Sequence, residues 1–257
     1  MTAAQQNFNM RAAAEPPLGE GDLRRALTPH GRPMNMNRHE IVCRRGSTAE
    51  TLYVVQHGWA ALRGPREGGR SAILRIYLPG EIVGLAEVGL QCVPQDVVML
   101  TEGLLSAVPR SALMAALRQQ PRLWPAIVGV AGTELAAARQ RAVLFDRATA
   151  EDRLIHLLLD IRARLAVEGV GDGNRFPVPL NQTEIGEATG MTGIYVNRLI
   201  GRMVRDRRIE VQRPYVRLLD RAGFEERIAA LDLSPATEVV GWAGRGSGSS
   251  GAMPGGR

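Results

Sequence analysis

The chain has 257 residues, of which 45% are hydrophobic and 23% are charged, and this ordinary globular composition excludes wholesale disorder. Its formal net charge of +6 comes from arginine alone, because the sequence contains no lysine, so the charge indicates a nucleic-acid partner only where arginines cluster. The sequence has no signal peptide and no apolar run of about 18 residues, so we expect a cytoplasmic protein of two domains without a membrane segment.

The predicted elements begin after residues 1–17, which show no sustained hydrophobic periodicity and which we expect to be disordered. Between about residues 40 and 110, short segments rich in Val, Ile, Leu and Tyr alternate with Gly and Pro residues of the kind that turns require. This regular alternation predicts an antiparallel β jelly roll, which we place at residues 18–117. The predicted strands are residues 52–56, 59–63, 72–78 and 97–100.

A long helix is predicted over residues 118–147, where Ala and Leu replace the strand-forming residues. Its apolar side chains recur at alternating steps of four and three, which makes one continuous seam over about three heptads. The small alanines in this seam favour close pairing with a second copy of the helix. The alternative is an amphipathic helix that lies on its own β domain. The seam residues are Trp124, Val128, Ala131, Leu135, Ala138, Ala142 and Phe145.

A second domain is predicted over residues 148–232, and it opens with a capped helix. Thr149 and Asp152 have the spacing of a capping box, and leucines recur at helical spacing after them. Glycines and prolines between residues 169 and 179 end this helix. The tail at residues 233–257 is rich in Gly and Ser, and we expect it to be disordered.

The segment 181–209 has the pattern of a helix-turn-helix. Asn181 is placed to cap a first helix with Glu184 as its partner, Gly190 supplies a left-handed turn, and Thr192 caps a second helix. The outer face of the second helix is predicted to enter a major groove with its N-terminal half. This face carries Gly193, Ile194, Asn197, Arg198 and Arg202.

A wing is predicted directly after the second helix. Residues 209–219 have the pattern of two short strands about Arg213 and Pro214, so the domain is expected to be a winged helix. Between residues 190 and 221 there are eight arginines and only three acidic residues, a local excess of positive charge that indicates DNA. The arginines are Arg198, Arg202, Arg205, Arg207, Arg208, Arg213, Arg217 and Arg221.

Over about residues 20 to 230, the chain resembles the Crp/Fnr superfamily of bacterial transcription regulators. The resemblance is carried by residues 52–62 (LYVVQHGWAAL), by residues 78–84 (LPGEIVG), and by the helix-turn-helix pattern at 180–209. It implies an α+β fold with an N-terminal, cyclic-nucleotide-binding-like antiparallel β jelly roll, a long dimerisation helix and a C-terminal winged helix-turn-helix.

The function that this resemblance implies is regulation of transcription by a homodimer that binds an inverted-repeat operator in double-stranded DNA, with RNA polymerase as a further partner and no enzymatic activity. The predicted DNA contacts are Asn181, Gln182, Thr192, Gly193, Ile194, Asn197, Arg198, Arg202 and Arg213.

The chain departs from the family at the residues that would bind cyclic AMP. The expected Gly-Glu pair is replaced by Gly84 and Leu85, and the expected Arg-Ser or Arg-Ala pair by Gln95 and Asp96. No Arg or Lys lies between Arg75 and Arg110, so no cation from this segment can pair with the cyclic phosphate. We therefore expect no control by cyclic AMP, and the sequence does not identify another effector.

The recognition helix departs as well, because the frequent Arg-Glu-xxx-Arg pattern is replaced by Gly193-Ile194-xxx-Arg198, which predicts a different operator. The cysteine cluster of the oxygen-sensing members is absent, and we expect Cys43 and Cys92 to be buried, reduced and without a cofactor.

A metal site, a catalytic site and a function without DNA have less support in the sequence. His39, Cys43 and His57 do not have the strand geometry of metal ligands, so no metal site is predicted. His156 lies among leucines and is interpreted as a packed, hydrogen-bonded side chain. No catalytic motif is found. The alternative function is a sensory or scaffolding module that acts through protein contacts, which salt dependence would distinguish from DNA binding.

Overall fold

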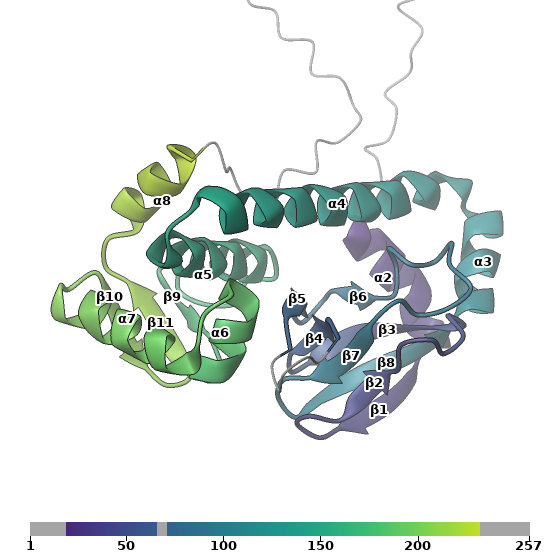
Figure 1. Ribbon diagram of the computed structural model, residues 1–257. Helices are drawn as coiled ribbons and strands as arrows, with labels where there is room; N and C mark the ends of the chain where they lie inside the picture. Colours follow the sequence, from purple (N-terminus) through teal and green to yellow (C-terminus); the bar gives the residue numbers. More distant parts are fainter. Residues whose placement is uncertain (1–18, 66–70, 232–257) are drawn as a thin grey trace, which may run out of the picture.

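The computed structural model describes residues 19–65 and 71–231, so the segments 1–17 and 233–257, for which disorder is predicted, lie outside the described residues. A β sandwich and a small helical domain lie side by side, and one long helix, α4 (Trp124–Arg147), runs along both of them (Figure 1). In the described part of the chain, no helix is both long and apolar enough to cross a membrane.

The N-terminal domain consists of two antiparallel four-stranded sheets, in the orders β1-β8-β3-β6 and β2-β7-β4-β5. All four predicted strands are present, and the jelly-roll prediction is confirmed. The sequence pattern missed four strands: β1, which contains Pro33; β2 and β6, which have only three and two residues; and β8, which has no aromatic residue and one β-branched residue. The strands are β1 (Arg32–Met36), β2 (Ile41–Cys43), β3 (Thr51–His57), β4 (Ala60–Arg63), β5 (Ile73–Tyr77), β6 (Ile82–Val83), β7 (Asp96–Met99) and β8 (Gly103–Pro109).

Strand β3 separates two apolar cores, because its side chains alternate between the faces of the sheet. Val55 packs between the two sheets with Tyr77 and Leu105. Leu52 and Val54 point the other way, to helices that cover the outside of the sheet. These helices are α2 (Glu20–Leu27), α3 (Arg110–Gln119) and the start of α4 (Trp124–Arg147).

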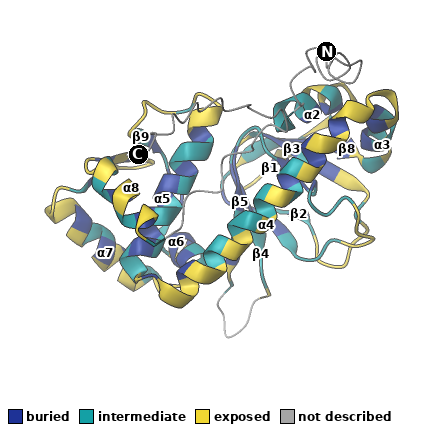
Figure 2. Ribbon diagram, turned by 90° about the horizontal axis from the view of Figure 1, so that it is seen from above, coloured by how far each residue is buried: buried dark blue, intermediate teal, exposed yellow. Residues whose placement is uncertain are grey.

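Helix α4 has 24 residues and begins after a short turn at Pro121–Leu123. Only four of its residues are buried, at its two ends: Ala126, Ile127 and Val130 lie against the β domain, and Leu144 lies near the second domain. Exposed residues recur along the rest of the helix (Figure 2). The helix is therefore packed by one narrow stripe and leaves much of its surface uncovered.

The C-terminal domain is a winged helix. The predicted caps are formed: Thr149 and Asp152 make a capping box at the start of α5, and Asn181 and Glu184 make another at the start of α6. A third wing strand, β9, was not predicted. The elements are α5 (Ala150–Val167), β9 (Arg175–Pro177), α6 (Gln182–Thr189), α7 (Gly193–Arg205), β10 (Ile209–Gln212), β11 (Tyr215–Leu218) and α8 (Arg221–Ala229), with the sheet in the order β10-β11-β9.

Ion pairs connect the two domains. The carboxylate of Glu184, which also caps α6, accepts two hydrogen bonds from Arg38 of the β domain, at 2.7 and 2.8 Å. Glu81, in the turn after β5, pairs with Arg164 of α5 at 2.7 Å. Burial favours the protonated form of Glu81, but Arg164 and Arg75 hold its pKa below the ordinary value. These contacts bring the first helix of the helix-turn-helix against the β domain.

Candidate nucleic-acid interface

The α6–α7 pair is held at its crossing by caps and glycines. The Oδ1 atom of Asn181 accepts a hydrogen bond from the Glu184 amide at 2.9 Å, and the Oγ1 atom of Thr192 accepts from the Tyr195 amide at 3.2 Å. Gly190 joins the helices with φ of 70°, a conformation that favours glycine. The angle between the two helices is therefore specified by local chemistry.

Gly193 lies on the inner side of this crossing. A Cβ atom added to it would lie 3.3 Å from the amide nitrogen and from Oγ1 of Thr183 in α6. The sequence pattern predicts Gly193 on the outer face, but the structure places its Cα against α6. The lack of a side chain is explained by close helix packing, and only the backbone of Gly193 is available to a ligand.

The outer face of α7 is solvent-exposed. Val196, Leu199 and Met203 form its buried inner side. Ile194 is 71% exposed, although an isoleucine has no polar group to hydrate. Next to it, Tyr195 is also exposed. Tyr195 is absent from the predicted DNA contacts, although its position outside the buried set of α7 was a signal that it lies on the outer face. The other exposed predicted contacts on this helix are Asn197, Arg198 and Arg202.

Not all of the clustered arginines are available to an anionic partner. Arg208 pairs with Glu151 and Asp220, Arg217 lies 4.0 Å from Asp172, and Arg221 pairs with Glu225. Within residues 19–65 and 71–231, the remaining five make no ion pair, and all of them are exposed. These unpaired arginines are Arg198, Arg202, Arg205, Arg207 and Arg213.

The wing places Arg213 at the turn between β10 and β11, beside α7 (Figure 1). The hairpin is braced from β9, where the guanidinium of Arg175 lies 3.9 Å from the centre of the Tyr215 ring. At the start of α6, Gln182 is partly exposed, whereas Asn181 uses its Oδ1 atom in the cap. The unpaired arginines of α7 and the wing thus all belong to the C-terminal domain.

Two family models match the chain, one in each domain. A cyclic nucleotide-binding domain matches residues 33–120, and a Crp-like helix-turn-helix domain matches residues 152–227. The chain belongs to the Crp/Fnr family of transcription regulators. It is a DNA-binding regulator that acts through its Crp-like helix-turn-helix, and it is not an enzyme.

Individual relatives agree with this assignment. The chain is 25% identical to the transcriptional activator protein FnrA of Stutzerimonas stutzeri over 198 residues, 77% of this chain and 80% of FnrA. It is 28% identical to the transcriptional activator protein FnrL of Cereibacter sphaeroides over 188 residues, 69% of this chain and 75% of FnrL. The structure of FixK2 from Bradyrhizobium japonicum matches with a TM-score of 0.69 at 20% identity, covering 76% of this chain and 96% of FixK2. The predicted fold class is confirmed.

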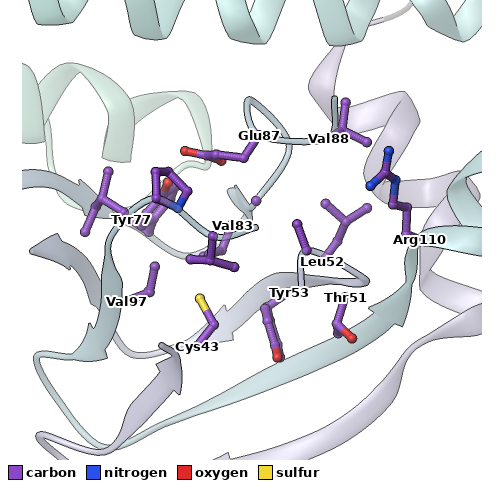
Figure 3. Close-up of a pocket in the computed structure, with 15 residues that line it drawn as sticks. Cys43, Thr51, Leu52, Tyr53, Tyr77, Val83, Glu87, Val88, Val97 and Arg110 are labelled. Carbon is purple, nitrogen blue, oxygen red and sulfur yellow. The ribbon is translucent and has the colours of Figure 1, made fainter. Parts of the chain in front are cut away.

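In this Crp/Fnr chain, the β domain contains a small pocket, whose lining residues are drawn in Figure 3. Its volume is about 20 Å³, which is room for about one water molecule. Tyr77, Val83 and Val97 narrow it, and Glu87 has a buried Oε2 atom without a hydrogen-bond partner among the described residues. A buried carboxylate disfavours a phosphate in the same space.

The four predicted effector-pocket positions do not offer ligand groups to this pocket. Gly84 contributes backbone to the lining, whereas Leu85 is fully buried in the core beneath α2 and α3. Asp96 accepts a hydrogen bond from the Arg45 amide at 2.7 Å, and neither it nor Gln95 lines the pocket. One arginine does line the pocket. Arg110, in the first turn of α3, lies at the end of the segment 76–109, which contains no Arg or Lys.

The two cysteines lie in different environments. Cys43 on β2 lines the pocket, and burial raises the pKa of its thiol to about 11. Cys92 is exposed, so the prediction that both thiols are buried is wrong for Cys92. It lies outside the named strands and forms an isolated antiparallel β-bridge with Thr48. In the described ranges, no group of three His, Cys, Asp or Glu side chains is placed to hold a metal ion.

Proposed function

We propose that this regulator binds an inverted-repeat operator as a homodimer and is controlled neither by cyclic AMP nor by an iron–sulfur cluster. The observation that carries the proposal is the uncovered apolar stripe on α4. Val128 is 67% exposed and Leu135 is 51% exposed, and Trp124 and Phe145 are exposed in the same row. A soluble chain rarely exposes four large apolar residues in one line unless a partner covers them. The seam is completed by Ala131, Ala138 and Ala142.

The alternative interpretation of the seam, packing on the chain's own β domain, has less support. That contact is made by the opposite stripe, with Ala126, Ile127 and Val130. A second α4 that pairs along the exposed stripe would relate two α7 helices by a two-fold axis. Two such helices fit successive major grooves about 34 Å apart, which requires an inverted repeat.

The proposed roles of the interface residues follow from their chemistry. Arg198 is proposed to read a guanine with its guanidinium, Asn197 an adenine, and Ile194 a thymine methyl group. Thr192, Gly193 and Gln182 lie at the N-terminal ends of the two helices, where free backbone amides favour phosphate oxygens. Arg202, Arg213 and the side-chain nitrogen Nδ2 of Asn181 are proposed to contact the sugar-phosphate backbone of the DNA.

Selection of bound duplexes from a random DNA library tests the proposal. The expected consensus is an inverted repeat whose half-sites are about one helical turn apart. Affinity measured by fluorescence anisotropy should fall steeply as salt rises, because bound phosphates release counterions. A protein that enriches no sequence and binds DNA independently of salt would instead support the scaffolding alternative. RNA polymerase is the proposed further partner, because two of the relatives are transcriptional activators.

Arg213→Ala is expected to reduce the affinity of the protein for operator DNA and for scrambled DNA by the same factor. If Arg213 contacts only phosphate, its loss removes electrostatic affinity without changing base preference, and the salt slope should decrease by about one per subunit. The matched control is Arg118→Ala, which removes an equally exposed arginine from α3 in the other domain. A loss confined to the operator would show that Arg213 reads sequence.

Millimolar cyclic AMP is expected to leave the melting temperature unchanged, because a pocket of about 20 Å³ cannot admit a nucleotide. Differential scanning fluorimetry provides the measurement, and a selected operator duplex is the positive control, since any ligand of the native state raises the melting temperature. A reproducible, saturable rise with cyclic AMP would mean that the β-domain pocket opens around it.

A further inference from the structure

A second cavity lies between the domains, outside the pocket of Figure 3. It is enclosed by the turn after β5, the C-terminal half of α4, and α5, with the end of α6 at one side. Its volume is about 380 Å³, within the usual range of about 300 to 1,000 Å³ for small-molecule sites. No residue of this cavity is explained by DNA reading, and only Phe145 is shared with the α4 seam.

An unpaired guanidinium lines this cavity. Arg141 of α4 forms no hydrogen bond and no ion pair with any residue that the structure describes. Desolvation by burial lowers its pKa, and the neighbouring Arg75 and Arg164 add to that effect, against the attraction of Asp160. A partly buried cation without a hydrogen-bonded partner is unfavourable, so this position favours an anion.

A second residue with an unpaired polar atom, His156 of α5, also lines this cavity. The Nε2 atom of His156 is buried and has no hydrogen-bond partner among the described residues, so the predicted hydrogen-bonded imidazole lacks a partner at this nitrogen. Desolvation by burial also lowers the pKa of His156, which leaves the ring neutral near pH 7. Buried polar atoms are nearly always paired, so an unpaired one beside a cavity indicates a missing ligand or water.

The other charged groups of the cavity already have partners. Arg164 pairs with Glu81 at 2.7 Å and with Asp160 at 2.8 Å. Arg75 pairs with Glu134, and Glu168 pairs with Arg24. Two further groups bind backbone atoms: Arg153 donates to the carbonyl oxygens of Ala148 and Thr189, and Glu20 accepts from the Ile82 amide. Among the described lining residues, Arg141 makes no hydrogen bond or ion pair, and two buried nitrogen atoms, Nε2 of His156 and Nε of Arg75, have no hydrogen-bond partner.

We infer that this interdomain cavity binds a small organic anion, with its charged group at Arg141 and His156 and its apolar body against the rest of the wall. Apolar side chains also line the cavity, with Ile73, Leu144, Leu157 and Val167 among them. A carboxylate and a phosphate monoester share the required chemistry. This ligand site depends neither on the operator nor on dimerisation.

Isothermal titration calorimetry of the full chain with octanoate and octyl phosphate tests the site, and octanamide is the uncharged control of the same length. We expect saturable binding of at least one anion and weaker binding of octanamide. Arg141→Gln should reduce affinity at least tenfold, and His156→Phe should also reduce it. Arg139→Gln is the matched control, because Arg139 lies on the same helix, is exposed and does not line the cavity. The anion that binds more tightly identifies the head group.

Thermal unfolding without ligand gives an independent readout. Arg141→Gln is expected to keep or raise the melting temperature, because it removes a buried charge that has no partner in the chain. A large fall would mean that Arg141 has a structural role. Absence of saturable binding by both anions, equal binding of octanamide, or unchanged binding by Arg141→Gln would overturn the inference.

Discussion

Leu135→Glu is expected to convert the protein from dimer to monomer. In the proposed dimer this residue faces its own copy across the α4 seam, so the substitution would bury two like charges in an apolar contact. In the single chain Leu135 is 51% exposed and glutamate is a good helix former, so the fold should be retained. Sedimentation velocity over a range of concentrations gives the oligomeric state, and circular dichroism checks the helix content.

The matched control for this prediction is Leu219→Glu. Leu219 is also 51% exposed but lies beyond the wing, far along the chain from α4, so the same chemical change there should leave the dimer intact. A folded Leu135→Glu variant that remains a dimer with unchanged self-affinity would show that the dimer forms through another surface. Operator affinity should fall together with dimerisation, because a monomer contacts only one half-site.

Arg198→Ala is expected to weaken operator binding by about 1 to 3 kcal/mol per half-site and to relax base preference at one position of each half-site. Arg198 is exposed in the N-terminal half of α7 and has no ion pair within the described residues, so the free protein should lose little stability. Fluorescence anisotropy on the selected operator and on scrambled DNA, at several salt concentrations, separates the two effects.

Arg198→Lys separates base reading from simple charge. Lysine keeps the positive charge but not the planar pair of donors that matches a guanine edge, so it should restore non-specific affinity without restoring the base preference. Full recovery of specificity by lysine would place Arg198 on a phosphate. Unchanged operator affinity in a folded Arg198→Ala dimer would contradict the assignment of α7 as the reading helix.

The elements that the sequence predicted best are those specified by neighbouring residues. The caps at Thr149, Asn181 and Thr192 and the turn at Gly190 depend on side chains within three or four positions of one another. The wing hairpin and the apolar seam of α4 follow equally local patterns. Such signals are carried by spacing alone, so they can be read before the chain is folded.

Tertiary structure decided which groups are available to a partner. Arg208 belongs to the predicted basic cluster, but it is neutralised by Glu151, which is 57 positions away in the sequence. Leu85 occupies a family effector position, but its side chain fills the core, and Arg110 reaches the β-domain pocket from outside the segment expected to supply a cation. Strands β1 and β8 were missed because they are held by pairing with each other and with β3, not by a pattern of their own.

The interdomain cavity is a feature that only tertiary packing decided. Arg141 and His156 are 15 positions apart on two different helices, and no motif connects them in the sequence. Their unpaired state results from where Arg164, Glu81 and Asp160 find partners, which only the packing of α4 and α5 against the β domain decides. The sequence by itself determined the architecture and the helix-turn-helix, because these depend on short-range patterns. Only the fold determined which charges remain free, because ion pairing is a long-range competition among many groups.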